Sequence, residues 1–105
     1  MPWILLVSAG LLEVVWAIAL KQSDGMSPRS PATYVFAVAA LASFVLLAQA
    51  LRSLPVGTGY AVWTGIGAVG AALVGVLALG EPATAARLGA IAMIAAGIVW
   101  LAAAT

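Results

Sequence analysis

The chain alternates between long apolar stretches and three short breaks in which polar residues, glycine and proline collect. A helix that crosses a bilayer needs about 20 mostly apolar residues. Four stretches come close to or exceed this length: residues 3–20, 32–51, 56–79 and 85–103. Lipid cannot satisfy backbone hydrogen-bonding groups, so each stretch is predicted to be helical. The pattern therefore predicts an all-α membrane protein, with residues 1–105 as a single domain of four transmembrane helices.

The breaks carry the residues that begin and end helices. They cover residues 21–31, 52–55 and 80–82. All five prolines fall at helix edges or in breaks, where a missing N–H does least harm. Six of the seven charged residues also lie in or beside the breaks, and the exception is Glu13. We interpret Lys21 and Asp24 as interfacial anchors, and Glu81 as a loop charge without a functional role.

The first stretch differs from a secretory signal peptide. It lacks a positively charged start, it is long for the apolar part of such a peptide, and Glu13 lies in its middle. We expect it to be a retained span, although residues 17–19 resemble a cleavage site. Trp3 and Trp100 lie near the two chain ends that face the same side, as residues of an aromatic belt would.

The distribution of positive charge predicts the orientation only weakly. The first and third connections share one side and carry Lys21, Arg29 and Arg87, whereas Arg52 lies on the other side. Three against one mildly favours a cytoplasmic location for the first and third connections. So small a difference is compatible with insertion in both orientations.

Composition narrows the class of protein further. Hydrophobic residues make up 66% of the chain and charged residues 7%, against about 25% charged residues in soluble domains. The chain has no cysteine and no histidine, so disulfides, zinc sites built on thiolate or imidazole, and a histidine base are excluded. A net charge of +1 without a basic tract excludes nucleic acid as a partner. We expect a multi-pass protein of the cell (plasma or inner) membrane, with the lipid bilayer as solvent, no enzymatic activity, no metal site and no cofactor.

Glu13 is the most informative residue. It lies about 15 Å along the helix from Trp3, near the middle of a hydrocarbon core about 30 Å thick. An ionisable residue at that depth costs at least about 2.5–3.5 kcal/mol on insertion scales, and such residues are usually functional. A carboxyl group there can hold a proton or a cation, but not both easily. The alternative is a permanently protonated Glu13 that joins helices by a hydrogen bond.

Four further side chains reach a similar depth. Ser43 lies about 13 Å from residue 52, and Trp63 and Tyr60 lie about 12 and 8 Å from residue 55 along their helix. Trp16 follows Glu13 by three residues and shares its helical face. These five residues are predicted to form one cation-binding layer, in which the carboxylate supplies charge and the rings supply their negative faces. The alternatives are simple packing for each aromatic ring and, for Ser43, a bond to the carbonyl four residues earlier in its own helix.

Residues 65–70 match the GxGxxG pattern of dinucleotide-binding folds. No strand precedes the pattern and no βαβ unit surrounds it, so we reject that interpretation. Gly67, Ala71 and Gly75 instead form a row of small residues spaced by four, which is typical of closely packed membrane helices. Seven of the eleven glycines lie between residues 57 and 80, and this density would also let the helix bend during transport.

Two stretches resemble the small multidrug resistance family, and within it the guanidinium exporter subtype. Residues 10–17 read Gly-Leu-Leu-Glu-Val-Val-Trp-Ala and are followed by Leu20-Lys21. Residues 54–67 read Leu-Pro-Val-Gly-Thr-Gly-Tyr-Ala-Val-Trp-Thr-Gly-Ile-Gly. Trp16 resembles the exporter subtype, since the polyaromatic-cation subtype usually has glycine there. Gly59 departs from the alanine common at that position. The resemblance covers essentially the whole chain.

This resemblance implies an antiparallel homodimer with dual topology. It also implies a proton-coupled antiporter that exports guanidinium or small guanidinyl cations, with Glu13 of each protomer binding substrate and protons in competition. By position, the binding residues would be Glu13, Trp16, Ser43, Tyr60 and Trp63, the same five that depth and helical face select. Oligomerisation is also predicted because four short helices leave no room for an enclosed pathway. The residues themselves do not select guanidinium over another small cation.

Two other functions remain as alternatives. The first is a broader exporter of quaternary ammonium and other multidrug cations. Trp16 and Ser43 argue against it, because bulk and hydrogen-bonding groups would make the site smaller and more polar. The second is a structural membrane subunit or assembly factor, in which Glu13 would tolerate replacement by glutamine.

Overall fold

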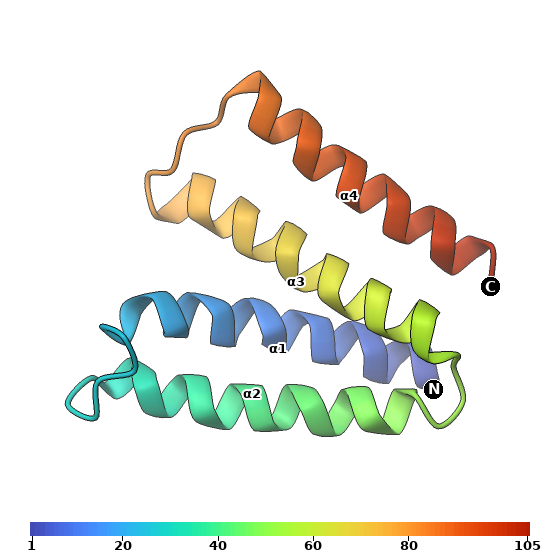
Figure 1. Cartoon of the computed structure of the whole chain (residues 1–105), viewed down its shortest axis with the longest axis horizontal. Coiled ribbons are helices and arrows are strands. Elements are labelled where there is room, and N and C mark those ends of the chain that lie inside the picture. The colour runs from blue at the N-terminus through green and yellow to red at the C-terminus, as the bar shows by residue number, and fades with distance from the viewer.

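The computed structural model describes all 105 residues of the chain. Its four α-helices are α1 (Pro2–Gln22), α2 (Pro31–Ala50), α3 (Val56–Ala78) and α4 (Ala85–Ala103) (Figure 1). Each is long and apolar enough to cross a membrane. This confirms the predicted all-α architecture with four transmembrane helices, and the chain is a multi-pass membrane protein.

The helices begin and end where the sequence carries breaking residues. Pro2 and Pro31 are the first residues of α1 and α2. A backbone N–H at the first position of a helix has no partner within that helix, so proline, which lacks this group, fits there. Thr84 caps α4 and accepts a hydrogen bond of 3.2 Å from the Arg87 backbone N–H. Gly80 follows α3 with a φ of +71°, a left-handed conformation that glycine adopts without strain. Local sequence therefore fixes the helix bounds.

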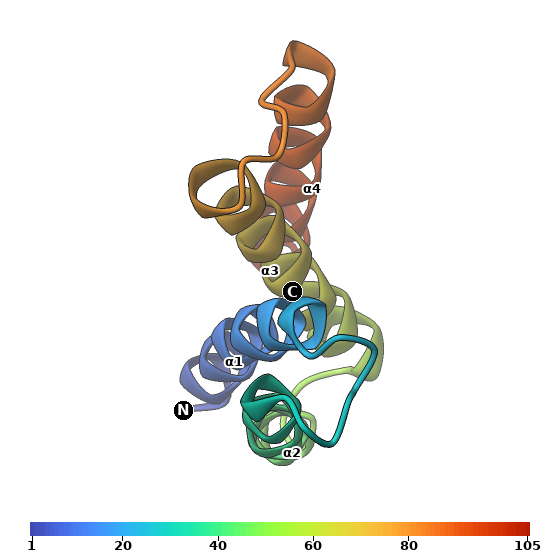
Figure 2. The ribbon, with the colours of Figure 1, turned by 90° about the vertical axis from the view of Figure 1, so that its left-hand side faces the viewer.

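The helices lie side by side in a single layer. α1 lies between α2 and α3, α4 packs against α3, and α2 and α3 touch weakly (Figure 1). Viewed from the end, the order across the layer is α2, α1, α3, α4 (Figure 2). The molecule measures 42 × 35 × 16 Å. Its shortest dimension is only slightly larger than the diameter of one helix, which is about 10–12 Å with side chains. A single layer of this kind encloses no pathway of its own.

The packed core lies at one end of the layer. It joins the first half of α1, the second half of α2 and the first half of α3, through Leu6, Ala9, Leu47, Ala50, Val62 and Trp63. Toward the other end, α1 and α3 diverge (Figure 1). No residue of α4 is buried, and Met93 and Trp100 are each 77% exposed. An apolar helix this exposed requires lipid or a second protein surface around it.

Glycines allow α1 and α3 to approach each other closely. A Cβ atom on Gly10 of α1 would lie 2.7 Å from Ile66 Cγ2 of α3, and one on Gly70 of α3 would overlap Val14 of α1. Ordinary carbon–carbon contacts are about 3.5–4.0 Å. The contact of these two helices therefore depends on the absence of side chains at both positions, and this contact contains Glu13.

Candidate functional site

Glu13 lies at the contact of α1 and α3. The residue is 8% exposed, and its carboxyl group rests on the backbone of Gly67, where any Cβ atom would overlap it. The Oε1 atom is buried and accepts no hydrogen bond. A buried carboxylate oxygen without a partner is costly. The site therefore favours a proton or a bound cation on this group.

Ser43 joins three helices through a single hydroxyl group. It is completely buried in α2. Its Oγ donates a hydrogen bond of 2.7 Å to the Ala9 carbonyl of α1 and accepts one of 3.0 Å from the Trp63 indole N–H of α3. The alternative of a bond within its own helix is therefore wrong. The network holds the Trp63 ring in place and reaches α1 at Ala9, one helical turn before Glu13.

Aromatic rings form a continuous row beside this network. The Tyr60 and Trp63 ring centroids are 5.4 Å apart, and the Trp63 and Phe44 centroids are 5.7 Å apart. Phe44 in turn lies 6.2 Å from Trp16, which meets Phe36 edge-on at 5.8 Å. These separations are typical of favourable aromatic pairs. The row runs from α3 across α2 to α1, and its Tyr60 end is 56% exposed.

Four of the five predicted site residues are thus connected. Ser43, Trp63 and Tyr60 contact one another in sequence, and Trp16 joins them through Phe44. Glu13 lies apart from this row, because its carboxyl group leans against α3 whereas the Trp16 ring leans against α2. Glu13 and Trp16 are neighbours along α1, as expected. Their side chains nevertheless pack against different helices, Glu13 against α3 and Trp16 against α2.

Two contributions to the site were not foreseen from the sequence. Phe44 connects Trp16 to Trp63. The sequence of α2 has no periodic apolar stripe that would have singled out this residue. Gly67 was expected only in a packing row, whereas it lies directly beneath the Glu13 carboxyl group. The indole N–H of Trp16 is also buried without a partner. One unpaired acceptor and one unpaired donor thus lie on neighbouring turns of α1.

The remaining small residues of the row also meet specific neighbours. Ala71 lines a cavity between α1 and α3, and a Cβ atom on Gly75 would overlap the carboxylate of Glu81. No group of three His, Cys, Asp or Glu residues lies close enough to hold a metal ion. The one buried ionisable group is the Glu13 carboxyl group, and the aromatic row and the Ser43 hydroxyl lie apart from it.

Four membrane-length helices and one buried carboxyl group define a small multi-pass membrane protein. A family model described as Small Multidrug Resistance protein matches residues 1–102, and the chain belongs to this family. The family and the relatives below make the chain a transporter rather than an enzyme. It is 55% identical over 101 residues to the guanidinium exporter of Escherichia coli K12, which covers 96% of this chain and 95% of that protein. It is 56% identical over 101 residues to the guanidinium exporter of Yersinia pseudotuberculosis, with 96% of each chain covered.

Proposed function

We propose that this protein is a proton-coupled antiporter that exports guanidinium or small guanidinyl cations across the cell membrane. The observation that carries the proposal is the buried Glu13 carboxyl group, which has an oxygen without a hydrogen-bond partner. The relatives named guanidinium exporter support the choice of substrate, because they match the chain over almost its whole length.

Guanidinium suits this carboxylate chemically. It is planar and permanently charged, and its N–H groups can donate two parallel hydrogen bonds to one carboxylate. Such a bond would satisfy the unpaired Oε1 of Glu13. A proton satisfies the same group by neutralising it. Because one carboxylate cannot hold both at full affinity, binding of protons on one side of the membrane would release the cation there.

The four neighbouring residues would define the shape of the pocket. The hydrogen bond from Trp63 to Ser43 holds one ring in place, and Trp16 and Tyr60 offer two more ring faces to a cation. Bulky indoles and a polar network favour a small, hydrogen-bonding cation over a large quaternary ammonium ion. We therefore place Trp16, Ser43, Tyr60 and Trp63 in the substrate pocket, with Gly67, Ala71 and Gly75 packing along the α1–α3 contact.

The transporting unit would be an antiparallel homodimer. A single layer of helices cannot surround a hydrated cation, and α4 has no buried residue in the protomer. Two copies would bring two Glu13 carboxylates to a shared site. An inverted pair of identical chains would reproduce the inverted repeats that many secondary transporters carry within one chain.

Uptake of labelled guanidinium into proteoliposomes under a pH gradient tests the function. We expect saturable, gradient-dependent uptake by the wild-type protein and none by Glu13→Gln, because an amide cannot exchange a proton for a cation. Asp24→Asn is the control, since it removes an exposed carboxylate outside the helices and should leave uptake unchanged. Wild-type uptake by a folded Glu13→Gln variant would contradict the proposal and favour a structural role for Glu13.

A further inference from the structure

A second carboxylate rests on α3 in the same way as Glu13. After α3 ends, Gly80 turns the chain back, and the backbone N–H of Glu81 donates a hydrogen bond of 3.0 Å to the Gly75 carbonyl. The Glu81 carboxylate lies against Gly75, where a Cβ atom would overlap it. The sequence suggested an ordinary loop charge, but both the backbone and a glycine on α3 hold this side chain in place.

Glu81 and Glu13 rest on the same row of small residues. Gly67 and Gly75 are eight residues apart in α3, which corresponds to about 12 Å along the helix axis. Ala71 lies halfway between them and lines a cavity of about 320 Å³. The two carboxylates therefore lie against the same row of α3, on either side of Ala71.

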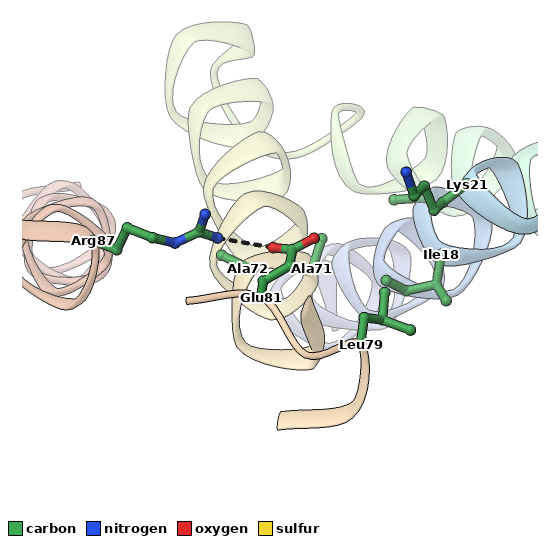
Figure 3. Close-up of a pocket in the computed structure, with 8 residues that line it drawn as sticks. Ile18, Lys21, Ala71, Ala72, Leu79, Glu81 and Arg87 are labelled. Carbon is green, nitrogen blue, oxygen red and sulfur yellow. Dashed lines mark hydrogen bonds and ion pairs between the residues drawn. The ribbon is translucent and has the colours of Figure 1, made fainter. Parts of the chain in front are cut away.

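The cavity lies between α1 and α3 and begins at Ala17, one helical turn beyond Glu13. Ala17 and Ile18 line it from α1, Ala71 and Ala72 line it from α3, and Glu81 and Arg87 lie at its outer part (Figure 3). Glu81 is the one carboxylate that lines this cavity. It is therefore the acceptor that a cation in the cavity would meet.

Arg87 shows which cation this carboxylate accepts. Its guanidinium Nη2 donates a hydrogen bond of 2.8 Å to Glu81 Oε1 (Figure 3). The side chains of Arg87 and Glu81 are 39% and 41% exposed, and ion pairs with this exposure contribute little stability. A free guanidinium ion carries the same planar donor group as Arg87. It can therefore compete with Arg87 for the same oxygen.

Lys21 limits how tightly a cation binds there. It lines the same cavity from the end of α1 (Figure 3), and Glu81 forms its ion pair with Arg87 rather than with Lys21. Together with Arg87 it leaves the outer part of the cavity with an excess of one positive charge, which weakens the binding of any further cation. Weak binding suits a site of passage, because transport requires that an ion leave a site as readily as it enters.

We propose that Glu81 is a second, weak binding site for guanidinyl cations at the outer part of the α1–α3 cavity, with the Arg87 side chain as its internal competitor. This inference rests on the proposed function, because it assigns to the same substrate a site outside the Glu13 layer. Substrate would exchange with Arg87 at Glu81 before or after it occupies Glu13.

Equilibrium binding of labelled guanidinium to the purified full-length protein tests this site. Glu13→Gln removes the central site and should leave weak, saturable binding. Glu13→Gln/Glu81→Gln should abolish that residual binding. Glu13→Gln/Arg87→Gln should strengthen it about three- to fivefold, the factor that a half-exposed ion pair is worth. Arg87→Lys keeps the charge without the planar fork and should give an intermediate gain, so it replaces Arg87→Gln if that variant does not fold.

The outcomes separate this inference from the proposed function. Glu13→Gln/Asp24→Asn is the matched control and should bind as Glu13→Gln does. Three results would overturn the inference: equal residual binding with and without Glu81, no residual binding in any variant, or no gain when Arg87 is removed. In each case guanidinium uptake by the wild-type protein would still support the proposed function. Loss of wild-type uptake with the Glu81 pattern intact would overturn the function alone.

Discussion

At the scale of single residues, the site combines a carboxylate and an indole N–H that both lack partners. Glu13 Oε1 and Trp16 Nε1 are buried without hydrogen bonds, whereas the hydroxyl of Ser43 and the indole of Trp63 are paired. The paired groups hold the site in shape, and the unpaired ones are free for a ligand. Two predictions follow from this division.

The first prediction concerns pH. If Glu13 binds the substrate as proposed, a proton on its carboxyl group removes the negative charge that the cation needs, so guanidinium affinity should fall as pH falls. Where one proton displaces one cation, the dissociation constant should rise by up to about tenfold per pH unit. Isothermal titration calorimetry of the wild-type protein across acidic to alkaline pH measures this effect. Affinity that stays constant over that range would rule out competition at Glu13.

The second prediction concerns Trp16. Trp16→Gly should weaken guanidinium binding by roughly two- to thirtyfold, the range of a cation–π contact. It should also admit larger hydrophobic cations into the space between Phe36 and Phe44 that the indole now occupies. Competition by tetraalkylammonium ions in the uptake assay measures the change in range. Trp16→Phe keeps an aromatic ring and should retain the wild-type preference for small cations. If Trp16→Gly accepts the same cations as the wild-type protein, Trp16 only packs against its neighbours and does not select the substrate.

Sequence reasoning placed the site residues by depth, but not by direction. Distance along a helix is fixed at about 1.5 Å per residue, so the shared depth of Glu13, Ser43 and Trp63 could be worked out. Direction depends on which neighbour a helix meets. No pattern in the residues indicates that Glu13 meets α3 and Trp16 meets α2, or that Phe44 connects two rings.

At the scale of the elements, the helix bounds were predictable and the helix order was not. Proline, glycine and charge mark the ends of each span, and the observed helices begin and end within two residues of the expected positions. The spans themselves are apolar on every side, as helices in lipid can be. Without a single apolar stripe to mark a buried face, the order α2, α1, α3, α4 could not be derived.

The third prediction concerns the contact of α1 with α3. Gly67→Ala should weaken guanidinium binding, because the added methyl group would displace the Glu13 carboxyl group from its place on α3. Gly57→Ala is the matched control in the same helix, since a Cβ atom there meets nothing within 4 Å. Binding and thermal unfolding of both variants should be measured together. Normal binding by Gly67→Ala would mean that Glu13 does not need its place on Gly67.

At the scale of the whole molecule, the chain forms a thin structure. Its helices form a slab 16 Å thick, and 18 of its 105 residues are buried. In the proposed dimer, a second copy would add another layer, and the direction in which the copies insert would decide how their sites meet.

The fourth prediction concerns that direction. The chain contains no cysteine, so Ser27→Cys in the connection between α1 and α2 provides a unique label. An antiparallel homodimer requires equal numbers of protomers in the two orientations. An impermeant thiol reagent applied to intact cells should therefore label about half of the molecules, and permeabilisation should expose the rest. Labelling of all or none in intact cells would exclude the antiparallel homodimer.

The position of the chain ends has a practical consequence for building a covalent dimer. The N- and C-termini lie at the same end of the layer (Figure 1), and Thr105 Oγ1 is 3.1 Å from Thr58 Oγ1 at the start of α3. Two copies fused through a short soluble linker would thus be forced into the same orientation. To encode opposed halves in a single polypeptide, a gene fusion needs an odd number of additional spans between them. The even number of helices therefore makes two separate chains, from one gene or from two, the simpler route to inverted symmetry.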